Sequence, residues 1–423
     1  MKKVINCIMI LGCALQIQPK VYGQQKIKVV DYKINKTQPG FYNATYTSTN
    51  GNKLRSRNLI STDNGVSWLE QSTTTKRIAF PPKYGRRVPV TSIYDANQNL
   101  FITFFNALDN PNVSSKIAEP KEALSGYYIR YRVSNDNGKS WLIDKPITLQ
   151  GNNYSARNPL PSVTIGENAF YLGDSGSRPI IVSNNTILLP AQKTVKANIQ
   201  NARLNKNQLY NPNGGYTYTE AIILRGSLEN QNIVWKNVST IAGDPGKTTR
   251  GLIEPTIVEL SNGNILSIMR GSNGGDKDKD FQLPSYKWMA YSSDKGNSWS
   301  KPEPWTYDNG ENFYSPSSMS ILHKHTNGSI FWVGNINKNN SKGNQNRYPL
   351  VIGEVDQKSM KLKKSSVITL DDLKQTDKAK GQLDLGHVTI IEDKKTKELI
   401  ITYPRIFGNS KQREWATIRL SIK

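Results

Sequence analysis

The stretch Ser292-Ser-Asp294-Lys-Gly296-Asn-Ser-Trp299 decides the fold, because its pattern Ser-x-Asp-x-Gly-x-x-Trp recurs along the chain. Two further full copies are Ser61–Trp68 and Ser134–Trp141, and Ser227–Trp235 is an eroded fourth copy. In such a turn the aspartate accepts backbone N–H groups, the glycine supplies a positive φ, and the tryptophan covers the hairpin. These boxes are therefore predicted to be folding devices of one repeated β-architecture.

A second set of hairpins lies between the boxes, and most of its members have an Asn- or Gly-containing turn near the middle. These hairpins are Pro89–Phe105, Pro179–Gln192, Pro255–Arg270, Pro316–Asn335 and Val388–Arg405. No segment carries a sustained 3.6-residue apolar period, which indicates an all-β protein. One boxed hairpin and one hairpin of the second set make four strands, which is one propeller blade. At roughly 65 residues per unit, the chain is predicted to be a single six-bladed β-propeller domain over residues 24–423, with five or seven blades as the alternatives.

Residues 1–23 are typical of a signal peptide. Lys2 and Lys3 form the positive end, Val4–Ile17 is mostly apolar, and cleavage is expected near Gly23. Lipidation at Cys13 is the alternative to cleavage. No later apolar run approaches the roughly 20 residues of a membrane span. We therefore expect a secreted or periplasmic protein.

The composition excludes several kinds of site. Both cysteines, Cys7 and Cys13, lie in the predicted signal peptide, so the mature chain has no disulfide and no thiolate nucleophile. No metal, phosphate-loop or dinucleotide motif is present, and no cofactor is expected. The formal net charge of +23 attracts polyanions. For an exported chain without a nucleic-acid motif, the expected partner is an acidic glycan rather than nucleic acid, bound by a monomer.

The hairpin Pro255–Arg270 provides the first candidate site. Its turn, Ser261-Asn262-Gly263, returns the chain on itself, so Glu254 and Arg270 should emerge at the same end. The inner strand of each blade lines the central channel, and a proline before a strand directs the preceding side chain. The other residues that directly precede predicted inner strands are Arg87, Arg178, Tyr314 and His387.

With three Asp boxes in one exported β-repeat chain, the sequence resembles the sialidase (neuraminidase) superfamily, from about residue 57 to residue 332. In sialidases a tyrosine attacks the anomeric carbon, a glutamate accepts its proton, and three arginines bind the substrate carboxylate. The resemblance implies that Tyr314 is the nucleophile and Glu254 its base. It also implies that Arg270 binds the acidic group of the substrate, with Arg178 and Arg87 as further candidates.

The chain departs from the sialidase pattern at two positions. The acid–base aspartate of the first blade has no clear counterpart, and Asp109 is only a weak substitute. No arginine lies between Arg270 and Tyr314, so Lys287 is the candidate for the third positive charge. His387 is a candidate general base because an imidazole titrates near neutral pH.

Three functions fit these residues. The first is a sialidase-like exo-glycosidase that acts on an acidic sugar or polysaccharide. The second is a polysaccharide lyase, in which Tyr314 or His387 removes the C5 proton of a uronate while arginine neutralises the carboxylate. The third is a propeller that binds acidic glycans without turnover.

Overall fold

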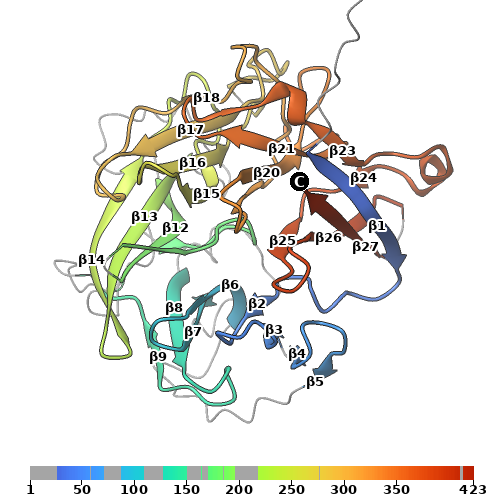
Figure 1. Cartoon of the computed structure of the whole chain (residues 1–423). Helices are drawn as coiled ribbons and strands as arrows, with labels where there is room; N and C mark the ends of the chain where they lie inside the picture. The colour runs from blue at the N-terminus through green and yellow to red at the C-terminus, as the bar shows by residue number, and fades with distance from the viewer. Residues whose placement is uncertain are drawn as a thin grey trace, which may run out of the picture.

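The computed structural model describes residues 26–57, 59–70, 87–108, 127–149, 163, 170–183, 185–195, 218–275, 277–409 and 413–423. The strands of these residues form six antiparallel sheets, which follow one another around a ring (Figure 1). The helices in the same residues are two short 3-10 helices, η3 (Lys364–Ser366) and η4 (Gln375–Lys380). Neither of them, nor any other described segment, forms a helix long and apolar enough to cross a membrane. The predicted all-β, six-bladed propeller is therefore confirmed, whereas the predicted signal peptide lies outside the described residues.

Each sheet is one blade of the propeller. The blades are numbered in chain order. Blade 1 contains β2 (Thr45–Tyr46), β3 (Leu54–Ser56), β4 (Leu59–Ser61) and β5 (Leu69–Glu70). Blade 2 contains β6 (Arg87–Asp95), β7 (Leu100–Leu108), β8 (Tyr127–Ser134) and β9 (Ile143–Pro146). Blade 3 contains β10 (Phe170–Tyr171), β11 (Ile180–Val182), β12 (Thr186–Val195), β13 (Tyr218–Glu229) and β14 (Asn232–Ile241).

The second half of the ring repeats this order. Blade 4 contains β15 (Ile253–Glu259), β16 (Ile265–Arg270), β17 (Lys287–Ser292) and β18 (Glu303–Pro304). Blade 5 contains β19 (Ile321–Lys324), β20 (Ile330–Asn335), β21 (Leu350–Asp356), β22 (Lys361–Leu362) and β23 (Ile368–Asp371). Blade 6 contains β24 (Leu383–Asp384), β25 (Thr389–Glu392), β26 (Leu399–Phe407), β27 (Glu414–Ile422) and the N-terminal strand β1 (Ile27–Asn35).

The pairing of β1 with β27 closes the ring. The two strands are antiparallel, with Ile27 opposite Ile422 and Asn35 opposite Trp415. Figure 1 shows the blue N-terminal strand beside the red C-terminal ones. The first and last parts of the described chain are thus joined in one sheet.

The hydrophobic core lies between neighbouring blades. Blades 5 and 6 share one cluster, in which Phe331 and Ile352 pack with Ile401 and Ile418, all of them fully buried. A similar cluster lies between blades 2 and 3. Each fully buried side chain of this size contributes roughly 1.5–3 kcal/mol, so these interfaces between blades stabilise the ring. The channel ends are therefore free to carry polar residues.

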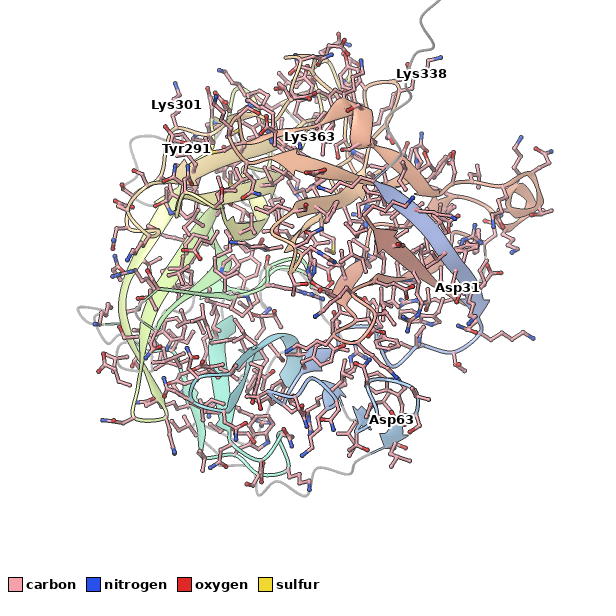
Figure 2. The ribbon with its side chains drawn as sticks, in the orientation of Figure 1. Asp31, Asp63, Tyr291, Lys301, Lys338 and Lys363 are labelled. Carbon is pink, nitrogen blue, oxygen red and sulfur yellow. The ribbon has the colours of Figure 1, made fainter. Side chains whose placement is uncertain are left out.

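The Asp boxes connect the third and fourth strands of their blades, as predicted. In blade 4 the Asp294 carboxylate accepts hydrogen bonds from the Ser292 hydroxyl at 2.7 Å and from the Ser298 N–H at 2.9 Å. Gly296 has a φ of +83°, which a residue without a Cβ adopts at little cost. Asp63 of the first box lies at the outer edge of its blade (Figure 2). The boxes are therefore far from the inner strands, which supports their predicted folding role.

Candidate functional site

The hairpin β15–β16 brings Glu254 and Arg270 to the same end of blade 4, as predicted. Ile253 pairs with Arg270, and a bulge follows before Thr256. Glu254 lies in this bulge with a φ of +51°, a region that is uncommon for residues other than glycine. Its N–H, which the ladder does not use, donates to the Gln192 side chain at 2.9 Å. The bulge therefore directs the carboxylate, and such local strain is common at functional sites.

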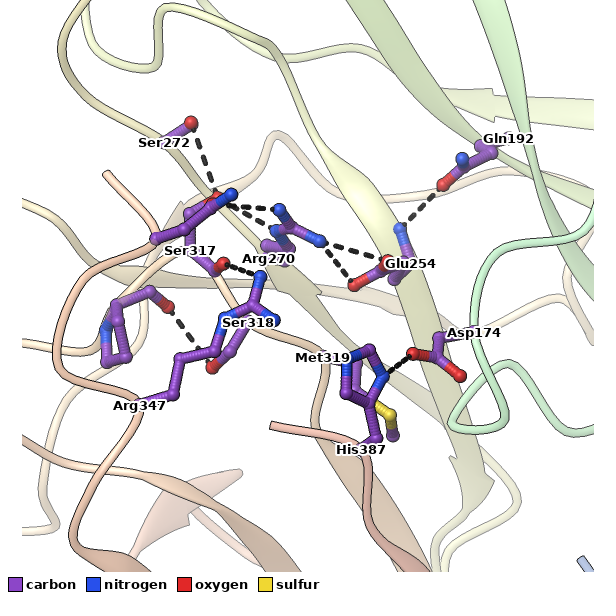
Figure 3. A network of polar contacts seen from close by, with 12 residues as sticks. Asp174, Gln192, Glu254, Arg270, Ser272, Ser317, Ser318, Met319, Arg347 and His387 are labelled. Carbon is purple, nitrogen blue, oxygen red and sulfur yellow. Dashed lines mark hydrogen bonds and ion pairs between the residues drawn. The ribbon is translucent and has the colours of Figure 1, made fainter. Parts of the chain in front are cut away.

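Four of the five side-chain N–H groups of Arg270 have acceptors among the described residues. Its Nη1 donates to both oxygens of Glu254, at 3.0 and 2.9 Å, and the two side chains are only 10% and 13% exposed. Its Nε donates to the Ser317 hydroxyl at 2.8 Å, and its Nη2 donates to the Asn344 amide oxygen at 3.1 Å (Figure 3). A planar guanidinium with acceptors on three sides has one fixed orientation.

His387 forms a second charged pair, with Asp174. Its Nδ1 is hydrogen-bonded to the Asp174 carboxylate (Figure 3). This carboxylate also accepts from the Ser175 N–H at 2.7 Å. Burial alone would lower the pKa of His387, but the hydrogen bond and charge of Asp174 outweigh it and raise this pKa. Burial alone would raise the pKa of Asp174, and the bonds from His387 and Ser175 hold it low.

The other ring nitrogen of His387 is available for chemistry. Among the described residues no group is hydrogen-bonded to Nε2, and the side chain is 35% exposed. Asp174 fixes the ring, because a carboxylate on Nδ1 sets both the orientation and the tautomer of an imidazole. The pair lies beside Glu254, because Gly173, which directly precedes Asp174, packs against the Glu254 side chain. A Cβ added to Gly173 would be 2.7 Å from the Cγ of Glu254. A proton donor or acceptor and a carboxylate therefore lie close together.

Arg347 lies beside Arg270 and was not predicted. Its Nη2 donates to the backbone oxygen of Ser317 at 3.1 Å, while its Nη1 donates to Asp384 at 2.9 Å. Ser317 thus contacts both guanidinium groups, one through its hydroxyl and one through its carbonyl (Figure 3). Two arginines that share one serine are a suitable binding site for an anion.

Lys287 is fully buried, and its ammonium faces backbone carbonyls. It donates to the oxygens of Ser318 and of Pro316, the latter at 3.4 Å. Burial, and then the charge of Arg270, lower its pKa well below the usual value. In this arrangement the ammonium supports the segment that carries Ser317, and it is not open to a ligand.

The prediction that an inner strand begins at Pro316 is wrong, because β19 begins at Ile321. Before β19, the backbone oxygens of Ser317 and Ser318 accept hydrogen bonds from the side chains of Arg347 and Lys287, and not from a neighbouring strand. Tyr314 lies outside this segment, with its ring stacked on Tyr286 at a centroid distance of 5.8 Å. Its hydroxyl makes no hydrogen bond to Glu254 in the part of the chain that the structure describes.

Arg178 and Arg87 lie apart from these pairs. The Arg178 guanidinium donates to the backbone oxygen of Ile390 in β25, the innermost strand of blade 6. Burial lowers the pKa of Arg178 to about 10. The backbone of Arg87 pairs with Ala107 at the start of β6, and its side chain is outside the described residues, as is Asp109. Arg178 thus links blades 3 and 6 across the inner strands.

Three of the predicted residues, Glu254, Arg270 and His387, therefore lie in one network with Asp174 and Arg347. Asp174 could have been noticed, because it lies four residues before Arg178 in a glycine-rich segment that leads to a predicted inner strand. Arg347 gave a weaker indication, two residues before Pro349. In the described part of the chain, no group of three His, Cys, Asp or Glu side chains could hold a metal ion.

Comparisons with known proteins agree with this fold. The model of the BNR repeat-like domain matches residues 115–411. A solved protein of unknown function from Dyadobacter fermentans superposes with a TM-score of 0.58 at 12% identity, covering 94% of this chain and 100% of that one. No curated protein sequence matches the chain.

Two sialidases of known structure are also similar. The NanB sialidase of Streptococcus pneumoniae gives a TM-score of 0.54 at 11% identity, covering 94% of this chain and 70% of the sialidase. The Trypanosoma rangeli sialidase gives a TM-score of 0.50 at 14% identity, covering 93% of this chain. The chain spans only 54% of that sialidase. At these identities the likeness is one of fold.

Proposed function

We propose that this chain, which belongs to the family of BNR repeat-like domains through its match over residues 115–411, is an exported exo-glycosidase acting on an acidic carbohydrate. The observation that carries the proposal is that the His387–Asp174 pair lies beside the network of Glu254, Arg270 and Arg347 (Figure 3). An anion site beside a carboxylate and a positioned imidazole supplies the groups needed to break a glycosidic bond.

The arginines bind the acidic group of the sugar. Arg270 and Arg347 each keep one carboxylate partner, Glu254 and Asp384, and meet at Ser317. A substrate carboxylate or sulfate at this point accepts from both guanidinium groups. The high positive charge of the chain assists its approach.

His387 supplies the proton that the missing aspartate of the sialidase pattern would provide. Its raised pKa favours the imidazolium, which donates a proton from Nε2 to the leaving oxygen as the anomeric C–O bond breaks. Glu254 accepts the proton of the nucleophile, which is Tyr314 in the sialidase resemblance or a water molecule. The lack of a hydrogen bond between Tyr314 and Glu254 favours water.

A lyase is the second candidate, and the unpartnered Nε2 of His387 favours it. In that reaction neutral His387 removes the C5 proton of a uronate, the C4–O bond breaks, and a C4–C5 double bond forms while an arginine neutralises the carboxylate. The imidazolium so formed returns the proton to the leaving oxygen. The two candidates differ in pH dependence. An acid role for His387 fails as pH rises through its raised pKa, whereas a base role requires that rise.

The test is incubation with a panel of sialosides and uronic polysaccharides, read by reducing ends and by ultraviolet absorbance. We expect new reducing ends without absorbance; absorbance of an unsaturated uronate would assign the lyase.

Glu254→Gln and His387→Asn should abolish turnover, and retention of full rate in both would overturn the site. Loss in Tyr314→Phe would assign the nucleophile to tyrosine, and retention would assign it to water. Retention on an acidic-glycan column without any turnover would leave a binding protein.

A further inference from the structure

A cavity of about 360 Å³ lies between blades 5 and 6, at the edge of the network described above. Its lining residues come from the loop before β21, from β24 and from the end of β26. They are Asn344, Gln345, Arg347, Gln382, Leu383, Asp384, Ile406 and Gly408. The volume is at the lower end of the roughly 300–1,000 Å³ that small-molecule sites have, which suits one or two sugar rings.

The cavity borders the anion site, because two of its lining residues belong to both. Asn344 accepts from Arg270 through its amide oxygen, at 3.1 Å. Arg347 reaches Ser317 on the side of Arg270 and Asp384 on the side of the cavity. A molecule whose acidic group lies between the arginines therefore extends directly into this space.

The lining favours hydroxyl groups over a second charge. Asn344, Gln345 and Gln382 have exposed amide side chains. Among the described residues, no protein group is hydrogen-bonded to the amide nitrogen of Asn344 or to the side-chain amides of the two glutamines. The one cation, Arg347, is paired with the one anion, Asp384, so the lining has no net charge.

The rest of the lining suits the ring of a sugar. Ile406, which is partly exposed, adds an apolar side to the cavity, which matches the C–H face of a pyranose.

We propose that this cavity is the binding site for a neutral sugar unit next to the acidic one, so that the protein recognises an acidic sugar together with its neighbour. The inference rests on the proposed function for the acidic unit. Free acidic monosaccharides fill only the anion site, whereas a disaccharide adds the hydrogen bonds of the amides and the contact with Ile406. The affinity should therefore depend on the length of the glycan.

The test compares two pairs of probes by isothermal titration calorimetry. The pairs are N-acetylneuraminic acid with 3′-sialyllactose, and glucuronic acid with an aldobiuronic acid in which it is linked to xylose. We expect the longer probe of at least one pair to bind at least about tenfold more tightly than its monosaccharide. Equal affinities within both pairs, or no binding of any probe, would overturn the proposal.

A variant that fills the cavity locates the effect. Gln382 is exposed, so Gln382→Trp should fold, and it should remove the tenfold gain while leaving the affinity for the monosaccharide unchanged. Gln382→Ala should reduce the gain about threefold. Lys301→Trp, an equally exposed change on the outer rim of blade 4, is the matched control and should keep the full gain (Figure 2). A gain that survives in Gln382→Trp would overturn the proposal.

The outcomes separate this inference from the proposed function. Length-dependent binding without turnover of any substrate would refute the enzyme and keep the sugar site. Turnover with equal KM values for short and long substrates would keep the enzyme and refute the sugar site.

Discussion

Asp294 and Glu254 belong to the same blade, but their carboxylates have very different partners. Asp294 accepts hydrogen bonds from Ser292 and Ser298, within its own turn. Glu254 pairs with Arg270 across a hairpin, and Arg270 continues the network to Ser317 beyond the blade. The box is complete within eight residues, whereas the site exists only when several blades are assembled. A local sequence motif therefore indicates the fold, whereas the proposed function depends on contacts between residues that are far apart in the chain.

The largest effect should follow from removing the centre of the long-range network. Arg270→Met leaves the Glu254 carboxylate and the acceptors Ser317 and Asn344 without their donor. Breaking a mostly buried ion pair in this way costs about 3 kcal/mol, and turnover should fall by more than about 100-fold. Urea unfolding and a rate assay measure the two effects. A variant within about 1 kcal/mol of the native stability would contradict the network, and Arg270→Lys tests whether charge alone suffices.

The next effect concerns the second pair of the network. In Asp174→Asn the negative partner of His387 is lost, so the pKa of His387 should fall toward or below its ordinary value of about 6.5. The pH limb of any activity should move to lower pH, and the rate should fall by about 100-fold. NMR titration of the imidazole protons measures the pKa without an assay, because the chain has only three histidines. An unchanged pKa of His387 in this variant would contradict the role of Asp174 in raising it.

Stability should also depend on pH through this pair. The pKa of His387 is raised in the folded state, so its contribution is full below the unfolded pKa of about 6.5. That contribution is lost as pH rises through the folded value. His387→Asn should therefore destabilise the protein more at pH 6 than at pH 9, by less than about 1 kcal/mol because the side chain is 35% exposed and solvent screens the pair. Equal losses at both values, measured by urea unfolding, would count against the charged pair.

The smallest effect should come from a box, and with the opposite dependence on pH. Burial would raise the pKa of Asp294, but hydrogen bonds from Ser298 and Ser292 hold it at about 2. Its contribution is present above the unfolded pKa of about 3.9 and is lost as pH falls through about 2. Asp294→Asn should cost about 1 kcal/mol at pH 7, as the loss of a helix-capping aspartate does, and activity should not change.

Thermal unfolding measures this loss, and Asp280→Asn is the matched control. Asp280 is also exposed, and in the described residues its carboxylate has no partner, so no change is expected. A box variant that loses activity at full stability would place the box in the site after all.

The fold was predictable from sequence because its determinants are local. The box pattern fixes bonds between residues two and four positions apart, as in Ser292–Asp294–Ser298. The turn of Pro255–Arg270 is equally local, and it suffices to predict that Glu254 and Arg270 lie at the same end of their hairpin. These features require only that a short segment adopts its preferred turn.

The rest of the site was not predictable, because its partners are far apart in the chain. His387 and Asp174 are 213 residues apart, and nothing in either segment indicates the other. Arg347 was missed because its loop returns to Ser317 only through tertiary packing. Tyr314 was predicted beside an inner strand, yet Ser315–Ser320 is held by side chains and shifts the strand to Ile321. Long-range polar contacts override local strand preference at such positions.

The closure of the ring by β1 and β27 has a consequence for synthesis. β1 leaves the ribosome long before its partner β27 is synthesised, since Ile27 pairs with Ile422. Until then, β1 presents an unpaired edge that can join a neighbouring copy. A short peptide copied from residues 27–35 would compete for the edge of β27 during refolding, and slower closure would favour chain exchange between nascent molecules.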